Sequence, residues 1–313
     1  MTSPNLMSAE SLPGVCEIHR FGPAGAPANL LIELPHGATE RSHYDSVAAQ
    51  LGSALPLNLE EFFHVNTDFG VPEMAFEIAA RLTGAARKAH TMGVVIVRAL
   101  VPRTFIDFNR AIGDAAAEPG MTPGLPPYIT AEADQQLLLS LYQQYRATVA
   151  GLYGQVCGPA SGAAVEGGLA VALHSYSPRS VEVSVDADIV TALRDAYRHA
   201  VYSRWSQRPG VDFITQDVDG HDLSPPGLVS ELRATYSALG LTAGENTSYR
   251  LHPATMGFRY ASSHPGQVLC AEFRRDLMGA PWRPFTPSRV GPRKIARLAR
   301  PLADALAQAL SSR

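Results

Sequence analysis

Five short apolar runs divide the chain, and they predict the strands of a buried sheet. Each run is bounded by Gly, Pro or polar residues, a pattern typical of strands that are buried on both faces of a parallel sheet. The predicted strands are residues 29–35, 93–101, 168–172, 211–214 and 267–271.

The segments between these runs have the periodicity of helices. Within residues 72–90, Met74, Ile78 and Leu82 recur at helical spacing, and Pro72 suits a first helical turn. Alternating strands and helices favour an α/β fold, in which helices cover both faces of a mostly parallel sheet. The other predicted helices are residues 42–51, 131–152, 187–200, 226–239 and 288–311.

The segments outside these strands and helices indicate the domain organisation and the loops. Residues 1–28 are expected to be a loose N-terminal segment, and residues 29–313 a single domain, because the sequence contains no internal repeat and no convincing linker. Residues 56–71, and the section just before residues 267–271, show no regular pattern. Residues 111–130 are rich in Gly and Pro, which predicts a surface loop and a candidate lid.

Composition narrows the class of protein. Hydrophobic residues make up 46% of the 313, enough for a substantial core, and the formal charge of −3 gives no reason to expect nucleic acid or an anionic membrane as partner. No apolar run approaches the roughly 20 residues of a membrane helix, and the N-terminus lacks the pattern of a signal peptide. The three cysteines are far apart and form no disulfide framework, so a cytoplasmic location is expected. The oligomeric state is left open.

Two histidines and a glutamate stand where predicted strands end. His36 follows the first strand, His174 follows residues 168–172, and Glu272 follows residues 267–271. Carboxyl ends of parallel strands share one edge of the sheet, where ligands bind. A lone histidine is more often structural than a ligand, but two at separate strand ends favour a zinc site with one position left for water. The third ligand is a carboxylate, either Glu40 or Asp68.

Glu272 and a basic segment supply the remaining candidate chemistry. A glutamate at the end of an apolar run is costly to bury unpaired, so it is either in a salt bridge with Arg274 or Arg275 or a general base for a metal-bound water. Arginine binds carboxylates through a planar fork. Residues 103–110 are therefore expected to hold an anionic substrate or to form a surface salt-bridge cluster, through Arg103, Asp107, Asn109 and Arg110.

These motifs, in this order, resemble the N-formylglutamate amidohydrolase family. The resemblance covers about residues 29–280 and is most specific in Arg103-Thr-Phe-Ile-Asp-Phe-Asn-Arg110, while the segment His174–Ser177 is similar to the zinc-ligand segment of metallocarboxypeptidases. It implies a three-layer α/β/α sandwich with a mixed, mostly parallel sheet, as in zinc exopeptidases, and one zinc ion per chain. It also implies the residue roles, as follows: His36, His174 and one carboxylate (Asp68, with Glu40 as the alternative) as zinc ligands, Glu272 and Arg103 as catalytic residues, and Arg103, Asp107, Asn109, Arg110, Arg259 and Tyr260 at the substrate.

The sequence departs from the family where the substrate pocket is expected. The segment nearest to the family's Asp-x-Asn-Leu-Gly-Thr is residues 212–219, which has no matching glycine. The family's Gly-Gly-x-Ile-Thr-Arg segment is matched only loosely by residues 256–260. The expected function is therefore a zinc-dependent amidohydrolase that cleaves a small N-formyl or N-acyl amino acid bearing a carboxylate. The alternatives are a zinc carboxypeptidase or deacylase of small peptides, a catalytically inactive binder of an acidic metabolite, and a protein whose two histidines are purely structural.

Overall fold

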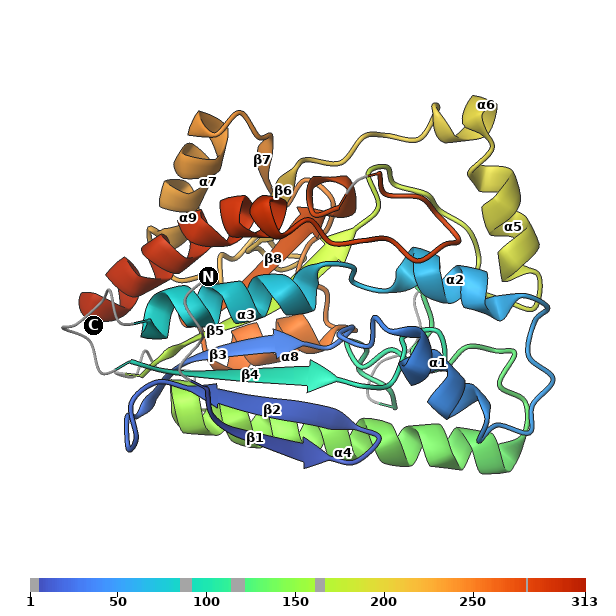
Figure 1. The fold of residues 1–313 in the computed structure, drawn as a ribbon, viewed down its shortest axis with the longest axis horizontal. Coiled ribbons are helices and arrows are strands. Elements are labelled where there is room, and N and C mark those ends of the chain that lie inside the picture. Colours follow the sequence, from blue (N-terminus) through green and yellow to red (C-terminus); the bar gives the residue numbers. More distant parts are fainter. Residues whose placement is uncertain (1–5, 85–91, 114–121, 161–166, 280) are drawn as a thin grey trace.

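One mixed sheet forms the centre of the molecule (Figure 1). The computed structural model describes residues 6–84, 92–113, 122–160, 167–279 and 281–313. Within this part of the chain, eight strands join edge to edge in the order β1 (Leu6–Leu12), β2 (Cys16–Phe21), β4 (Gly93–Ala99), β3 (Ala28–Leu34), β5 (Leu169–Tyr176), β8 (Val268–Arg274), β6 (Val211–Ile214) and β7 (Ala243–Glu245).

The four central strands are parallel. β4, β3, β5 and β8 run in one direction, whereas β2 and β6 pair antiparallel on their outer sides. Because these central strands are covered on both faces, they read as nearly continuous apolar runs, as the sequence predicted. The carboxyl ends of β3 and β5 therefore meet at the same edge, together with the end of β8.

Helices cover both faces of the sheet, which confirms the predicted α/β class. α3 (Val71–Thr83), α7 (Leu228–Ala238) and α9 (Pro292–Ser311) pack with Leu30 and Ile32 on one face. α4 (Glu132–Cys157) and α8 (Met256–Ser263) pack with Leu31 on the other. Figure 1 shows α3 and α9 on one side of the sheet and α4 along the opposite side. The short helices are α1 (Arg41–Ala48), α2 (Leu59–Asn66), α5 (Ile189–Ala196) and α6 (His199–Tyr202).

The expectation of a loose segment before residue 29 is wrong for its described part. β1 and β2 form an antiparallel pair there, and β2 continues the sheet by pairing with β4. β2 is fully buried only at its first and last residues. Its middle positions are half-buried and carry Glu17, His19 and Arg20, so the strand shows no apolar run in the sequence.

Other boundaries differ from the prediction for local reasons. α2 lies within residues 56–71, where no pattern was expected; it spans only eight residues and begins after Asn58, whose φ is 58°. The predicted helix at 187–200 is interrupted between α5 and α6, and the section before β8 contains β7 and α8. The end of the helix predicted at 72–90 and the centre of the candidate lid, residues 114–121, lie outside the described residues. None of the helices described is long and apolar enough to cross a membrane.

Candidate functional site

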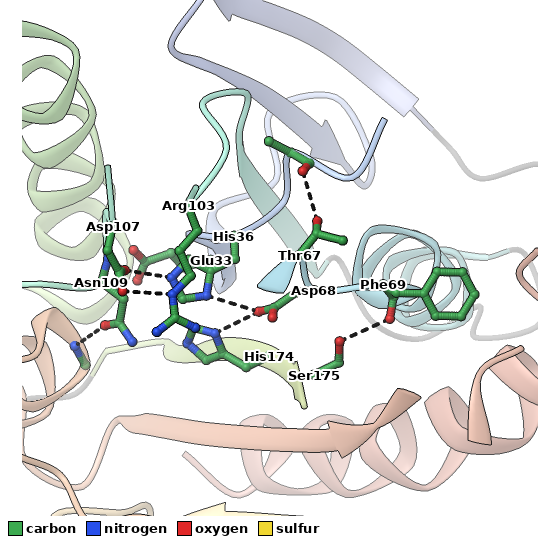
Figure 2. A network of polar contacts seen from close by, with 12 residues as sticks. Glu33, His36, Thr67, Asp68, Phe69, Arg103, Asp107, Asn109, His174 and Ser175 are labelled. Carbon is green, nitrogen blue, oxygen red and sulfur yellow. Dashed lines mark hydrogen bonds and ion pairs between the residues drawn. The ribbon is translucent and has the colours of Figure 1, made fainter. Parts of the chain in front are cut away.

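His36, Asp68 and His174 meet at the carboxyl edge of β3 and β5. Nδ1 of His174 lies 2.9 Å from Oδ2 of Asp68, and Nδ1 of His36 lies 3.3 Å from the same oxygen. One nitrogen or oxygen atom from each residue lies within 4.8 Å of the others. All three residues are buried, and Figure 2 shows the two imidazoles and the carboxylate turned toward one another. This cluster is the candidate metal centre.

Close packing after β3 places His36. The next residue, Gly37, donates its N–H to the carbonyl of Leu34 and accepts from Nε of Arg98. A Cβ at Gly37 would lie 2.6 Å from Cγ of Arg98, closer than real contacts allow. Glycine is therefore required beside His36 because the backbone and the Arg98 side chain approach each other so closely.

The atoms of the cluster fit a zinc ion. Among the described residues, Nδ1 of His36 is buried without a hydrogen-bond partner, because its contact with Asp68 lacks hydrogen-bond geometry. A buried polar atom left unpaired is unfavourable by about 1–3 kcal/mol, so such atoms in native structures call for an explanation. Coordination of a cation would satisfy this nitrogen. Two imidazole nitrogens and one carboxylate oxygen are a common catalytic zinc set that leaves a position for water.

The connection between α2 and α3 holds Asp68 in place. Thr67 Oγ1 donates to the carbonyl of Ala38 at 3.0 Å, and Ser175 Oγ donates to the carbonyl of Phe69 at 3.1 Å. These bonds tie the connection to the segment after His36 and to β5, as Figure 2 shows. Ser175, which lies beside His174 in sequence, is thus a structural donor and not a nucleophile.

Arg275 supports Asp68 from the buried side. Its Nη2 lies 3.5 Å from Oδ1 of Asp68 and donates to the carbonyl of Ser175 at 2.9 Å, while Nη1 donates to the carbonyl of Val65. Burial alone would raise the pKa of Asp68, but the charges of His36 and His174 and the hydrogen bond from His174 lower it overall. Asp68 is therefore a carboxylate, the form that a metal ion requires.

Asp107 links His36 to Arg103. His36 Nε2 donates to Oδ1 of Asp107 at 2.8 Å, and Arg103 Nε donates to Oδ2 at 2.9 Å. Burial raises the pKa of Asp107, but the charges of Arg103, Arg110 and His36 hold it well below its usual range. With its Nε2 proton engaged in this way, His36 presents a lone pair on Nδ1. Asp107 was expected either at the substrate or as a residue that holds an arginine in place. At 1% exposure it holds Arg103 and also contacts His36, a candidate ligand.

We expect Asp107→Asn to weaken zinc binding by about 10- to 100-fold, the usual effect of losing a carboxylate that orients a metal-ligating histidine. A zinc titration against a competing chelator measures the change. Asp134→Asn is a matched control, because Asp134 is also buried but accepts hydrogen bonds from Gly52 and Ser53. Equal zinc affinity in the Asp107→Asn and wild-type proteins would contradict the orienting role.

Arg103, Asn109 and Arg110 lie around Asp107. Several acidic groups lie near Arg103. Burial lowers the pKa of Arg103, but Asp107, Asp68, Tyr249 and Glu272 raise it overall. Asn109 uses its side-chain oxygen to accept from the N–H of Gly257, near the start of α8 (3.1 Å). Arg110 donates from Nε to the carbonyl of Thr122 at 3.0 Å. Arg103 is therefore better placed than Asn109 or Arg110 to meet a ligand beside the cluster.

Glu272 lies beside His174, its register partner on the neighbouring strand. Its Oε2 is buried and has no hydrogen-bond partner among the described residues. Salt bridges to Arg274 or Arg275 were the structural alternative, but Arg274 pairs with Asp276 at 2.8 Å and Arg275 contacts Asp68. Burial raises the pKa of Glu272, with an opposing effect from His174. A carboxylate with a raised pKa and an unused oxygen suits a general base.

Three predicted site residues lie elsewhere. The side chain of Glu40 is 61% exposed and pairs with Arg98 at 3.0 Å, so the geometry leaves Asp68 as the carboxylate of the cluster. Tyr260 stacks on Tyr153 of α4 with ring centroids 4.0 Å apart. Arg259 lines a surface cavity between α4 and α8. Both were expected at the substrate; the structure places them in and beside the packing of α8 on α4.

Sequence reasoning also missed residues near the cluster. Glu33 on β3 is buried and accepts hydrogen bonds from Tyr153 (2.9 Å) and Tyr145 (3.4 Å). Burial raises its pKa, while the hydrogen bond from Tyr153 and the charge of His174 lower it. A charged residue inside an apolar run was a visible signal. The sequence signal for Arg275 was weaker, because the sequence suggested this residue only as a salt-bridge partner of Glu272.

Known structures share this fold. No protein-family model matches the chain, and no curated protein matches it. The crystal structure of N-formylglutamate amidohydrolase from Ralstonia eutropha JMP134 is 18% identical, with a TM-score of 0.55, over 94% of this chain and 97% of that one. The chain has the fold of an N-formylglutamate amidohydrolase. A gene product from Agrobacterium tumefaciens is likewise 18% identical over 94% of this chain and 95% of its own, with a TM-score of 0.50.

The likeness to the N-formylglutamate amidohydrolase fold extends over nearly the whole of both chains. It confirms the resemblance that the motifs around His36, Arg103, His174 and Glu272 predicted. At this level of identity the likeness concerns the fold. The chemistry depends on the residues of the site.

Proposed function

We propose that this protein is a zinc-dependent amidohydrolase that cleaves the amide of N-formyl or N-acyl amino acids. The observation that carries the proposal is a buried His36–Asp68–His174 cluster with the unpaired carboxylate of Glu272 on the adjacent strand. His36, Asp68 and His174 would hold the ion. When bound, zinc lowers the pKa of a water ligand from 15.7 to about 7 and polarises a carbonyl.

Glu272 and Arg103 supply the remaining groups for hydrolysis. The Glu272 carboxylate takes a proton from the attacking water as the water oxygen bonds to the amide carbon. Glu272 then returns this proton to the amide nitrogen as the C–N bond breaks, which yields a carboxylic acid and a free amino acid. The guanidinium of Arg103 binds the substrate carboxylate or the developing negative charge on the carbonyl oxygen.

A substrate panel tests this function. We expect the zinc-loaded protein to release formate from N-formyl-L-glutamate, and a chelator to remove this activity until zinc is restored. The panel also contains N-acetyl and N-succinyl amino acids and dipeptides with a free carboxyl terminus. Faster cleavage of dipeptides would favour a carboxypeptidase, and turnover of none of these compounds despite bound zinc would contradict the proposal.

A further inference from the structure

Glu33 is a buried carboxylate that the proposed reaction does not use. It lies on β3, three residues before His36, and is 3% exposed. Its two oxygens accept hydrogen bonds from different tyrosines of α4, Oε2 from Tyr153 at 2.9 Å and Oε1 from Tyr145 at 3.4 Å. Burial raises the pKa of both tyrosines well above the usual value, so each keeps its proton and remains a donor. Two such donors favour the ionised form of Glu33.

Sheet geometry places this carboxylate beneath the candidate metal centre. In the parallel pairing of β3 with β5, Glu33 is the register partner of Ala172, and both side chains leave the sheet on the α4 face. His174 leaves the same face two residues beyond Ala172, a rise of about 6.6 Å along the strand. Glu33 therefore lies one layer deeper in the core than His174. Figure 2 shows it together with His36 and His174.

No cationic side chain neutralises Glu33 in the described part of the chain. Two other buried carboxylates near the cluster contact arginines, Asp107 with Arg103 at 2.9 Å and Asp68 with Arg275 at 3.5 Å. Within the described ranges, Glu33 forms no ion pair with any arginine, lysine or histidine, and its partners are the two tyrosine hydroxyls. A buried charge without a countercharge is unfavourable, and neutral hydrogen bonds offset only part of this effect.

Positive charge in the layer above Glu33 acts on it. The charges of His174 and His36 lower the pKa of Glu33 against the larger effect of burial. The rings of both tyrosines are stacked on other aromatic rings, with centroids 4.0 and 4.5 Å apart, so the carboxylate is held in place. Because the interior screens charges less than water does, a divalent cation between the two imidazoles would be attracted by this carboxylate without touching it.

We propose that Glu33 is a buried countercharge of the metal centre, which strengthens the binding of a divalent cation through its charge and without contacting the ion. The inference rests on the metal site of the proposed function and assigns a role to a residue outside that site. It has two consequences of opposite sign. Loss of the charge weakens zinc binding, but it also removes an unneutralised buried charge from the metal-free protein, which is then no less stable than before.

Two substitutions separate charge from shape. Glu33→Gln keeps the shape and removes the charge, whereas Glu33→Asp keeps the charge on a shorter side chain. We expect Glu33→Gln to weaken zinc binding by at least about tenfold, because a carboxylate attracts a divalent ion strongly through the interior, and Glu33→Asp to bind zinc more tightly than Glu33→Gln does. Titration against a competing chelator measures both. Asp134→Asn, which alters a buried carboxylate that accepts from Gly52 and Ser53, should keep the wild-type affinity.

Thermal unfolding of the same proteins tests the second consequence. Without metal, Glu33→Gln should unfold at the wild-type temperature or above it; at one fixed zinc concentration it should unfold below the wild-type protein, since weaker binding stabilises less. Equal destabilisation in both conditions would make Glu33 a structural residue and overturn the proposal.

These measurements do not depend on hydrolysis, so the countercharge is supported even if the protein cleaves no amide. Tight zinc binding by the wild-type protein with unchanged affinity in Glu33→Gln would reject the countercharge alone. A wild-type protein that binds no zinc would reject both the countercharge and the proposed function.

Discussion

His36→Ala and His174→Ala should each abolish stoichiometric zinc binding, and hydrolysis should fall with it by at least about 1,000-fold. The estimate follows because a catalytic metal contributes several kcal/mol of transition-state stabilisation and each 1.4 kcal/mol is a factor of ten in rate. Both imidazoles approach the same oxygen of Asp68, so loss of either leaves an incomplete ligand set. Elemental analysis of purified protein, together with the rate of formate release, measures both effects.

Two controls make this result specific. His264 is also a buried histidine, but it stacks on Tyr153 with ring centroids 5.9 Å apart, so His264→Ala should reduce stability and leave zinc content unchanged. Glu40→Gln should keep its zinc, since Glu40 is exposed and paired with Arg98, whereas Asp68→Asn should lose it. If His36→Ala and His174→Ala both retained full zinc content, the histidines would be structural residues and the candidate metal centre would be wrong.

The central strands and the cluster were predictable from sequence because both follow from local rules. Strands buried on both faces are nearly all apolar, so β3, β4, β5 and β8 stand out in the sequence. Parallel strands end at a common edge, so His36 and His174 could be brought together without knowing their coordinates. Asp68 lies in a connection between helices, and its selection over Glu40 came from the family resemblance, not from any strand rule.

Other features depend on contacts that residue spacing does not encode. β2 is half-buried, so its charged residues hide its place in the sheet. Tyr260 and Arg259 precede β8 by eight and nine residues, and α8 places them toward α4. Asp107 was noticed, but its role depends on His36, 71 residues away in sequence.

The charges of the site explain why its buried groups are tolerated. Asp68 and Asp107 would each be unstable alone in the interior, but each contacts both a histidine and an arginine. Glu272 differs from them because burial raises its pKa and one of its oxygens has no partner among the described residues. This contrast separates the carboxylates that build the site from the one that is available for proton transfer.

Glu272→Gln should therefore abolish turnover while zinc remains bound. Glutamine has the same shape as glutamate but cannot accept the proton of the attacking water, and a positioned general base contributes about 100- to 10,000-fold in rate. The substitution removes no atom from the His36–Asp68–His174 set, so zinc content and its affinity should stay close to those of the wild-type protein. Steady-state kinetics and elemental analysis on the same sample give both quantities.

Glu245→Gln provides the matched comparison. Glu245 lies at the sheet edge on β7 and pairs with Arg233 at 2.8 Å, so its loss should leave kcat near the wild-type value. A low rate in Glu272→Gln with full zinc content assigns the proton transfer to Glu272, because neither ligand loss nor unfolding then explains the defect. Substantial activity in Glu272→Gln would remove Glu272 from the mechanism, and a loss of zinc together with activity would instead make Glu272 part of the metal site.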